Sequence, residues 1–456
     1  MQNRPATKNT IYCLAIISIC YLYAGSAYMS QFYRLMDHFD ERMVDIITSG
    51  INYLLQAAGI GLFSLGLRIS PRWFDPRKLF IVSLITGLPF MFTAQFAHSG
   101  SLIMTSGFIF QLHIGIYLGY YLSLLAISVS PSGSGLIYGT AYAIGSLGTY
   151  LLSLPRDGAF LTSRPICLLY TVLALTAALL TLSMVEKPET AKKPKEIEPE
   201  KPIKDFRRQL LSLSCMIAVM TLISVMGSGL FYSFPPAKNV NWNLIRAFYA
   251  GGLILSGFLM DKSRKLGGIC TVASLTYPLI AIALAGEDIT GTVSLSLSYF
   301  FRGFLSVYYV TSFTDLSSEN RRHLPVAPLG LLVSRITEAL LTFLLTYMII
   351  PLKGQLILTA LFFAPLIIFY FLTQTEKEHS PSSEMQRKKD ALFAEKYGLT
   401  AREAQVLDCL CKGMSDKEIA ECCFISKNTV RFHVSNLLKK LGAASRVEAI
   451  RAHEKF

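Results

Sequence analysis

Charge is scarce in this sequence. Only 16% of its 456 residues are Asp, Glu, Lys or Arg, whereas 52% are hydrophobic. A soluble globular domain carries about 25% charged residues. The shortage of charge therefore excludes a water-soluble enzyme of this size and predicts a membrane protein.

Cysteine pairs with the spacing of metal or disulfide sites are also missing. The nine cysteines are scattered among apolar stretches and the C-terminal segment, and they form no pair of CxxC motifs and no framework typical of secreted domains. The sequence contains no nucleophile with a matching base and no phosphate-binding loop in a plausible context. We therefore expect no catalytic residue, no metal site and no cofactor, and we do not expect an enzyme.

Acidic residues are outnumbered by basic ones. The chain has 43 Lys and Arg against 30 Asp and Glu, a formal net charge of +13. Such an excess suits nucleic acid or anionic lipid as a partner. Much of it lies in a few loops and in the C-terminal segment, so its location is more informative than its total.

Long apolar runs are abundant. A helix needs about 20 apolar residues to cross the hydrocarbon core of a bilayer. Arg4 and Lys8 precede the first run, as basic residues do in a signal peptide, but the many runs that follow favour an uncleaved first membrane helix. Twelve runs qualify as candidate spans: 11–30, 46–67, 79–97, 102–127, 134–154, 166–185, 209–233, 243–260, 267–286, 292–313, 328–350 and 354–373.

A polar segment divides these runs into six and six. Residues 186–208, EKPETAKKPKEIEPEKPIKDFRR, are rich in Lys, Glu and Pro and too poor in apolar groups to bury a core. We expect a flexible cytoplasmic linker here, between the two halves, 1–185 and 209–373, of a membrane domain that spans 1–373.

Basic residues also indicate the orientation of the chain in the membrane. Cytoplasmic connections of membrane proteins carry an excess of Lys and Arg. Clusters of these residues follow the second, sixth and eighth runs, whereas the connection that holds Asp37, Asp40 and Glu41 is poorer in them. We therefore expect the even-numbered connections and both termini in the cytoplasm.

One loop motif follows the eighth run. In GFLMDKSRK, Gly257 would permit close approach of two helices, and Asp261, next to Lys262, would face the N-terminus of a neighbouring helix. The segment resembles the loop motif G-x-L-x-D-R/K-x-G-R/K of the major facilitator superfamily, although Arg264 stands where the motif has Gly and the first half has Ser70 where Asp belongs. The resemblance implies an all-α bundle of about 12 transmembrane helices with Gly257, Asp261 and Lys262 as a conformational gate. The two departures weaken the case for proton-driven transport.

Three charged residues lie well inside the predicted spans, whereas Arg246 lies near enough to the end of the eighth for its side chain to reach the membrane surface. A charged side chain near the bilayer centre costs at least a few kcal/mol, so each is a candidate for function. Arg302 lies in the tenth run, and Arg335 and Glu338 lie three residues apart on one face of the eleventh. They would form a ligand-binding cluster or, alternatively, Arg335 and Glu338 would neutralise each other and hold helices together.

Uncharged polar residues form a second group of candidates. Gln111, His113 and Tyr117 lie within about two turns of the fourth run, and Asn52 and Gln56 are four residues apart in the second. They suit recognition of a small polar or aromatic molecule, but interhelical hydrogen bonding explains them almost as well. Both interpretations stay open.

The chain after the last run has the pattern of a tethered helical domain. We expect residues 374–390 to form a polar tether and residues 391–456 to form a small four-helix domain. Three positions have the signature of a helix N-terminus: Thr400 with Glu403, Ser415 with Glu418, and Ser426. Four helices are predicted: from Thr400 to before Gly413, at 416–423, at 427–441 and at 445–453. The short second helix, tight turn and longer basic third helix make a helix-turn-helix.

This segment is similar to the LuxR-type DNA-binding domain along LTAREAQVL, GMSDKEIA and ISKNTVRFHVSNLLKKLGAASRVEAI. The resemblance implies that Arg431, Phe432 and Ser435 reach base edges of double-stranded DNA, with Arg431 suited to guanine and Phe432 to a thymine methyl group. It also implies phosphate contacts from a second set: Lys417, Lys427, Thr429, Lys439 and Lys440. For Lys439 a merely solvated charge is an equal alternative. Cys409, Cys411 and Cys423 occupy positions where the family has small core hydrophobes.

The two resemblances together imply a membrane-bound transcriptional regulator in a bacterial cytoplasmic membrane. We find no receiver domain before the helix-turn-helix, so an unidentified small molecule, in a class that includes small aromatics, is the expected signal. Paired half-sites on DNA and a homodimer are expected for such a domain. The alternative is a transporter for small molecules that carries a regulatory DNA-binding tail.

Overall fold

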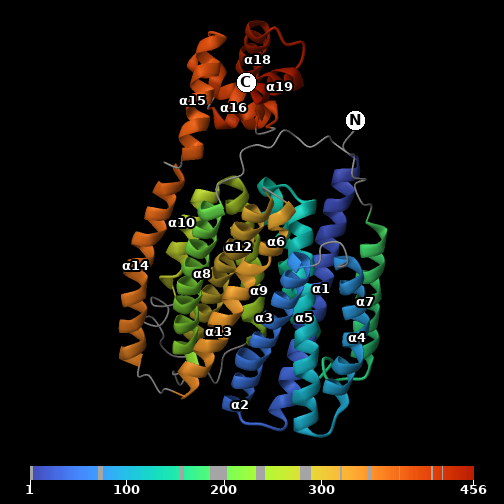
Figure 1. Cartoon of the computed structure of the whole chain (residues 1–456). Helices are drawn as coiled ribbons and strands as arrows, with labels where there is room; N and C mark the ends of the chain where they lie inside the picture. The colour runs from blue at the N-terminus through green and yellow to red at the C-terminus, as the bar shows by residue number, and fades with distance from the viewer. Residues whose placement is uncertain are drawn as a thin grey trace. The chain divides into compact units, whose positions relative to one another are not determined.

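The computed structural model describes residues 4–69, 75–154, 159–184, 203–232, 242–277, 289–318, 321–347, 352–378, 381–411, 414–423 and 425–456. Every regular element in these ranges is a helix, as the composition predicts (Figure 1). The chain divides into two compact units, Met1–Tyr370 and Phe371–Phe456. Each is described by itself.

The first unit contains two groups of helices. Those of the first half are α1 (Arg4–Met36), α2 (Glu41–Asp45), the π-helix η1 (Ile46–Ile51), α3 (Asn52–Ile69), α4 (Pro76–Phe96), α5 (Gly100–Ser128), α6 (Pro131–Ser153) and α7 (Pro165–Ser183). Those of the second half are α8 (Ile203–Tyr232), α9 (Trp242–Lys262), α10 (Arg264–Ser274), α12 (Ile289–Ser318), the 3-10 helix η4 (Arg321–Val326), α13 (Leu329–Tyr347) and α14 (Leu352–Glu378), whose residues after Tyr370 belong to the second unit. Figure 1 shows the two groups side by side.

Each of the twelve predicted spans overlaps one of these helices. The ninth, 267–286, is helical to Ser274, and residues 278–288 lie outside the described ranges. Within the described residues, seven helical segments are long and apolar enough to cross a membrane. Other bundle helices, such as α6 and α12, carry many Gly, Ser and Thr residues that lower their hydropathy.

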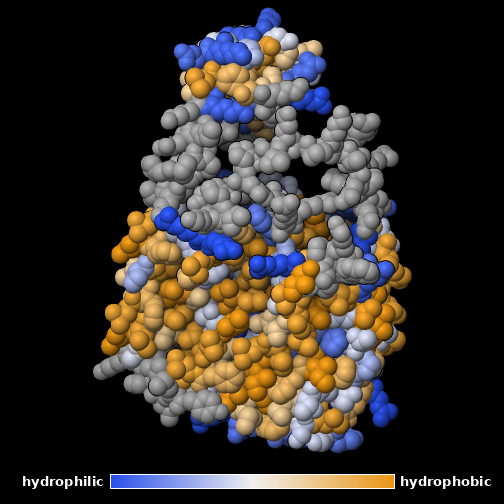
Figure 2. Space-filling model, viewed as in Figure 1, coloured by the Kyte–Doolittle hydropathy of each residue, from blue (hydrophilic) through white to orange (hydrophobic). Residues whose placement is uncertain are grey.

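Large apolar side chains cover the outside of the bundle. Leu168 and Leu179 on α7 and Leu361 and Ile368 on α14 are all more than 60% exposed. The face seen in Figure 2 is correspondingly hydrophobic over the helical body. Such a surface is stable against lipid rather than water.

The two halves meet closely where glycines line α6 and α9. A Cβ atom at Gly139 would overlap the carbonyl of Leu253, and one at Gly257 would overlap the carbonyl of Gly135. These backbones can approach this closely only because side chains are missing there. Gly257 therefore lies at the close helix approach that the sequence predicts.

The second unit is built on five helices: α15 (Pro381–Lys396), α16 (Ala401–Cys411), α17 (Asp416–Cys422), α18 (Lys427–Leu441) and α19 (Arg446–Lys455). Its core contains Phe393, Val406, Leu410, Ile419, Val430 and Leu437. Thr400 and Glu403 form the predicted capping box, since the Thr400 N–H donates to the Glu403 carboxylate over 2.7 Å and the Glu403 N–H donates to Thr400 Oγ1 over 3.3 Å. Ser426 accepts from the N–H of Thr429, and Gly442 ends α18 with φ of +62°.

Two segments expected to be irregular contain helix in their described residues. The linker 186–208 runs into α8, which begins at Ile203, so the prediction of a flexible segment is wrong for 203–208. The tether 374–390 overlaps the end of α14 and the start of α15. Glu, Lys, Gln and Met favour helix, and α15 is anchored by the buried Phe393, so a polar composition did not exclude helix here.

Candidate functional site

A cluster of charged side chains lies between the two halves of the bundle. Arg302 on α12 donates from Nη2 to Glu338 Oε1 over 3.0 Å, and Arg335 on α13 donates from Nη1 to Glu338 Oε2 over 3.1 Å. The guanidinium carbon of Arg335 lies 4.0 Å from the ring centroid of Tyr53 on α3 of the first half. Two cations thus contact one carboxylate, so the self-neutralising pair expected as an alternative is part of a triad that also includes Arg302.

The predicted amide residues form a separate network inside the first half. Gln56 Nε2 donates to Gln111 Oε1 over 2.7 Å, while Asn52 Nδ2 and Gln111 Nε2 each donate to Gln31 Oε1 over 3.2 Å. These side chains are buried, and they join α1, α3 and α5. The cavity next to Gln31 has a volume of about 10 Å³, which is room for one water molecule at most. The geometry favours interhelical hydrogen bonding over ligand contact for this group.

His113 and Tyr117 turn toward α4 instead. Tyr117 donates to the carbonyl of Ser83 over 3.1 Å, and His113 Nε2 lies 3.2 Å from Thr86 Oγ1. His113 Nδ1 is also 2.8 Å from the carbonyl of Ile109. The eight predicted ligand residues therefore lie in three places, and only Arg302, Arg335 and Glu338 lie at the interface between the halves.

The loop motif lies at a second contact between the halves. Asp261 at the end of α9 accepts from the N–H groups of Gly135 and Leu136 over 2.9 and 2.7 Å. Both donors belong to the first two turns of α6, where the helix dipole favours an anion. The predicted contact of Asp261 with a helix N-terminus is present, whereas Lys262 is exposed.

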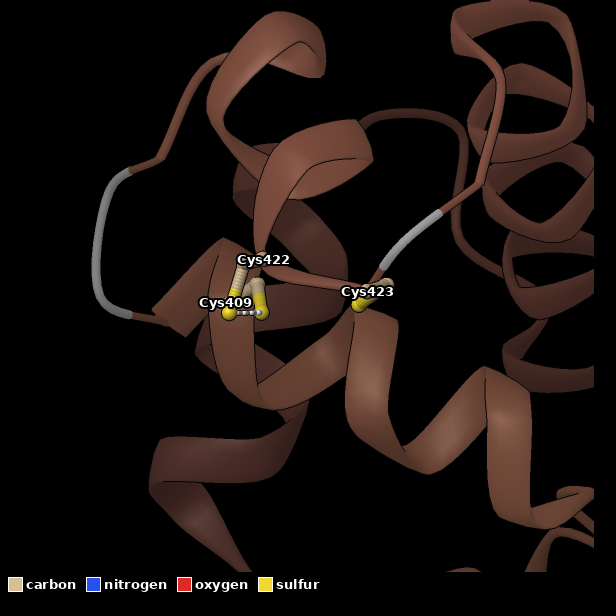
Figure 3. A group of neighbouring side chains, drawn as sticks. All are labelled: Cys409, Cys422 and Cys423. Carbon is tan, nitrogen blue, oxygen red and sulfur yellow. Dashed lines mark hydrogen bonds between the residues drawn. The ribbon is translucent and has the colours of Figure 1, made fainter.

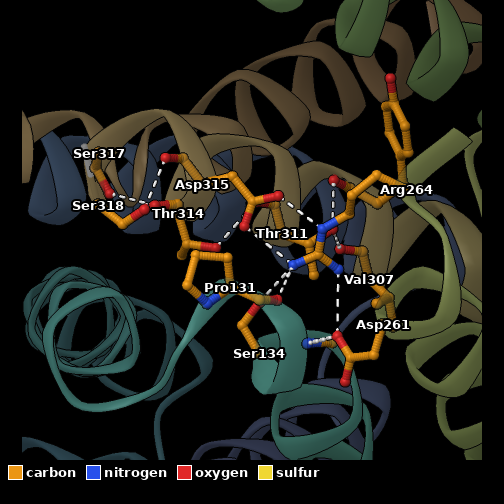
Figure 4. A network of polar contacts seen from close by, with 12 residues as sticks. Pro131, Ser134, Asp261, Arg264, Val307, Thr311, Thr314, Asp315, Ser317 and Ser318 are labelled. Carbon is orange, nitrogen blue, oxygen red and sulfur yellow. Dashed lines mark hydrogen bonds and ion pairs between the residues drawn. The ribbon is translucent and has the colours of Figure 1, made fainter. Parts of the chain in front are cut away.

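Arg264, which departs from the motif, is the centre of this contact (Figure 4). Its guanidinium donates to Asp315 on α12 and to Asp261, and it also reaches the Pro131 carbonyl and Ser134 Oγ on α6. From the sequence, Arg264 was only a departure from the motif, because its partners other than Asp261 lie 51 to 133 residues away. Ser70, the corresponding departure in the first half, lies outside the described residues.

The exposed face of α18 carries the predicted base-reading residues. Arg431 has 68% of its side chain exposed, Phe432 is 62% exposed, and Ser435 is exposed beside them. The opposite face packs into the core through Val430, Val434 and Leu437. Because α18 is held by this apolar face, its polar face is free to enter a major groove.

The predicted phosphate residues differ in their surroundings. Lys427 and Lys439 are exposed, and Thr429 shares a 2.8 Å hydrogen bond with Ser426 at the helix cap. Lys440 instead donates to Glu403 over 2.6 Å and to the carbonyl of Gly398 over 2.8 Å. A phosphate contact by Lys440 would thus compete with an internal ion pair. The side chain of Lys417 lies outside the described residues.

An acidic residue at the start of α17 links the recognition helix to α19. Asp416 pairs with Arg446 over 2.7 Å and lies 3.6 Å from Arg431. The hydrogen bond from Arg446 lowers the pKa of Asp416 below its usual range. Asp416 therefore stays ionised and offers Arg431 an internal partner in the absence of DNA.

Three thiols of this unit lie together (Figure 3). The sulfur atoms of Cys409, Cys422 and Cys423 are all within 4.8 Å of one another, and those of Cys409 and Cys422 are 3.9 Å apart. A tetrahedral zinc site with bonds of about 2.3 Å needs sulfur atoms about 3.8 Å apart. The spacing of these thiols is compatible with a soft metal ion, whereas the sequence indicated no metal site. The sequence did not reveal the group because Cys409 and Cys422 are 13 residues apart and belong to different helices.

Comparison with known proteins supports a DNA-binding role for the second unit. Residues 398–453 match the family of bacterial regulatory proteins, luxR family. The segment is 44% identical over 62 residues to the spore germination protein GerE of Bacillus subtilis, covering 14% of this chain and 84% of GerE. It is 42% identical over 83 residues to the transcriptional regulatory protein YhcZ of the same organism, covering 18% of this chain. The match spans only 34% of the length of YhcZ.

Solved structures resemble the first unit in fold. The human organic anion transporter MFSD10 aligns over 81% of this chain and 99% of its own, with a TM-score of 0.57 and 12% identity. The fucose:proton symporter FucP of Escherichia coli aligns over 79% of this chain and 98% of its own, with a TM-score of 0.53 and 13% identity. Identities this low establish the fold alone. The chain is thus a multi-pass membrane protein with a major facilitator-like bundle, and through its C-terminal domain it belongs to the luxR family of bacterial regulatory proteins.

Proposed function

We propose that this protein is a membrane-bound, one-component regulator of transcription. In this proposal the bundle binds a small molecule, and occupancy changes the presentation or the dimerisation of the C-terminal DNA-binding domain. The observation that carries it is the presence, in one chain, of a complete helix-turn-helix with an exposed recognition face and of a membrane bundle with a charged cluster between its halves.

Double-stranded DNA is the proposed partner of α18. Arg431, Phe432 and Ser435 would contact base edges, and the exposed Lys427 and Lys439 would contact phosphates. Domains of this kind bind paired half-sites, so we propose that a homodimer occupies the operator. The excess of positive charge in the chain favours the same partner.

The proposal requires that both chain termini lie in the cytoplasm of a bacterium. Basic clusters after the second, sixth and eighth predicted spans support this orientation by the positive-inside rule. Arg264 and Lys265, for example, follow α9 next to the Asp261 contact. The gate at Asp261 would then lie on the side of the membrane where DNA is available.

The likeness to transporters supports a second candidate function, transport of a small molecule by a protein whose tail adds regulation. Reconstituted protein in liposomes tests it directly. Uptake that depends on Arg302 and Glu338 would support transport. Transcriptional control without uptake would favour the regulator.

The regulatory proposal is tested by transcript profiles of cells that carry either the native chain or the double variant Arg431→Ala, Ser435→Ala. Both strains are exposed to the same panel of small molecules, and membrane levels of the two proteins are matched by immunoblot. We expect a small set of genes to respond to one compound in the native strain only. Identical profiles under every condition would contradict the proposal.

A further inference from the structure

We infer that the charged cluster between the two halves recognises the carboxylate of a small organic acid that carries an aromatic ring. This inference rests on the proposed function, since it names the chemical class of the molecule that the bundle would bind. The cluster consists of Arg302, Arg335 and Glu338 together with Tyr53.

The first argument is the charge of the cluster. Two guanidinium groups, which stay protonated under all ordinary conditions, converge on the single carboxylate of Glu338. The side chains of Arg302, Arg335 and Glu338 are only 27%, 17% and 11% exposed. Guanidinium groups inside a membrane bundle are poorly solvated, so they attract an anionic ligand strongly.

The second argument is an unused donor. The Nε atom of Arg335 is buried and has no hydrogen-bond partner among the residues that the structure describes. Its Nη1 donates to Glu338, so the guanidinium still has a donor for a further acceptor. Arginine binds carboxylates through two parallel N–H groups, and this geometry discriminates a carboxylate from a neutral amide.

The third argument is the aromatic surroundings. Tyr53 stacks on the guanidinium of Arg335, and the rings of Tyr142, Tyr249 and Tyr299 form a chain of edge contacts with centroid separations of 5.3 and 6.5 Å. Tyr299 precedes Arg302 by three residues, so the two lie on one face of α12. These rings come from α6, α9 and α12, so they offer aromatic surface from both halves to a ring attached to the carboxylate.

The cluster lies between the two halves, so a bound ligand would affect how the halves contact each other. Tyr53 belongs to the first half, whereas Arg302, Arg335 and Glu338 belong to the second. An anion held between them would strengthen the contact between the halves. Binding would therefore favour the conformation in which the halves are closed around the cluster.

Matched pairs of acids and amides provide the test. Thermal unfolding of the full-length protein in lipid nanodiscs is measured with benzoate, 3-phenylpropionate and cinnamate, and with the neutral carboxamide of each. A ligand that binds only the folded state raises the unfolding temperature. We expect at least one carboxylate to do so and its amide to bind at least tenfold more weakly.

The variant Arg335→Gln should abolish the difference between acid and amide. Arg34→Gln is the matched control, since the Arg34 side chain is 21% exposed and also has a buried Nε without a partner, but its charge is balanced by Asp37. If Arg335→Gln does not fold, Arg335→Lys replaces it, and we expect tenfold weaker binding of the acid because the planar guanidinium is lost.

Equal shifts for acids and amides, no shift with any compound, or an unchanged preference in the Arg335 variant would overturn the inference. The regulatory proposal is separable, because it is measured by transcripts and depends on Arg431 and Ser435. Induction by neutral compounds alone would leave regulation intact and refute anion recognition. Selective binding of acids without any change in transcripts would support anion recognition and refute the regulatory proposal.

Discussion

Arg264 and Asp315 form a two-point ion pair, from Nε to Oδ2 over 2.7 Å and from Nη2 to Oδ1 over 3.0 Å. The same guanidinium reaches Pro131 and Ser134 on α6, so this pair joins the second half of the bundle to the first. A residue that breaks the family motif thereby takes part in the contact that the motif is expected to make. We therefore regard Arg264 as a latch between the halves.

Removal of this latch should open the bundle at the end that contains it. Arg264→Ala deletes several charge-assisted hydrogen bonds, and because the side chain is one-third exposed we expect a loss of roughly 1–2 kcal/mol in the closed state. The alkylation rate of a cysteine introduced by Met260→Cys, at a buried position next to Asp261, should then rise about tenfold. Lys262→Ala, at an exposed position nearby, serves as the control. Equal rates in the latch variant and the parent would rule the latch out.

Close packing of α6 on α9 gives a second prediction. A Cβ at Gly139 overlaps the backbone of Leu253, whereas a Cβ at Gly61 meets only Leu332 Cδ1 at 3.7 Å. Gly139→Ala should therefore destabilise the bundle by about 1–3 kcal/mol, as overpacking does, and Gly61→Ala should have little effect. Thermal unfolding in detergent compares the two. If both variants behaved alike, contact between α6 and α9 would not limit stability.

The ion pair of Glu403 and Lys440 makes the DNA-binding domain sensitive to acid. Burial alone would raise the pKa of Glu403, but hydrogen bonds from Lys440 and Thr400 bring it below its usual range. A lowered pKa contributes stability that is present above the unfolded-state value of about 4.3 and is lost as pH falls through the folded-state value.

Glu403→Gln should therefore weaken the domain at pH 7 by roughly 1–3 kcal/mol and flatten its dependence on pH in the acid range. Hydrogen exchange of peptides from α16 and α18 reports this in the full-length protein. Glu395→Gln, at an exposed position on α15, is the control. The same acid dependence in Glu403→Gln and the parent would show that the pair is not responsible.

Base-contacting and phosphate-contacting residues of α18 should affect DNA binding in different ways. Arg431→Ala should lose about 1–3 kcal/mol on the operator and relax its sequence preference, because it removes a bidentate base contact. Lys439→Ala should weaken binding to all sequences alike and reduce the slope of affinity against salt by about one unit. Gel-shift titrations at several salt concentrations, on promoter fragments from the transcript experiment, distinguish the two. An unchanged salt slope in Lys439→Ala would assign that residue to a solvated surface.

The thiols of the second unit should differ in reactivity. Burial raises the pKa of the Cys409 thiol to about 12, whereas Cys422 is exposed. Because the thiolate is the nucleophile, iodoacetamide at pH 7.5 should modify Cys422 at least tenfold faster than Cys409. Peptide mass spectrometry of the native and the urea-unfolded protein measures both rates. Addition of Zn²⁺ that protects Cys422 would reveal metal binding by the cluster, and equal rates for the two thiols would contradict the prediction.

Much of the helical framework was predictable, because its signals are local. Apolar runs of membrane length overlap the bundle helices, and the spacing of Thr400 and Glu403 placed the start of α16 correctly. The alternation of buried Val430 and Val434 with exposed Arg431 and Ser435 follows from helical periodicity alone. The polar tether was less predictable, since α15 is stabilised by burial of Phe393, a contact between helices.

Composition, periodicity and capping residues by themselves determined that this is a helical membrane protein with a C-terminal helix-turn-helix, because each of these signals acts between residues a few positions apart. Tertiary structure alone decided that Arg302, Arg335 and Glu338 share one site while Gln56 and Gln111 lie in another. It also decided that Lys440 pairs with Glu403, and that Arg264 joins the two halves. Apart from Arg335 and Glu338, which are three residues apart on α13, these partners are tens of residues or more apart in sequence. Only the packing of helices brings them within hydrogen-bonding distance.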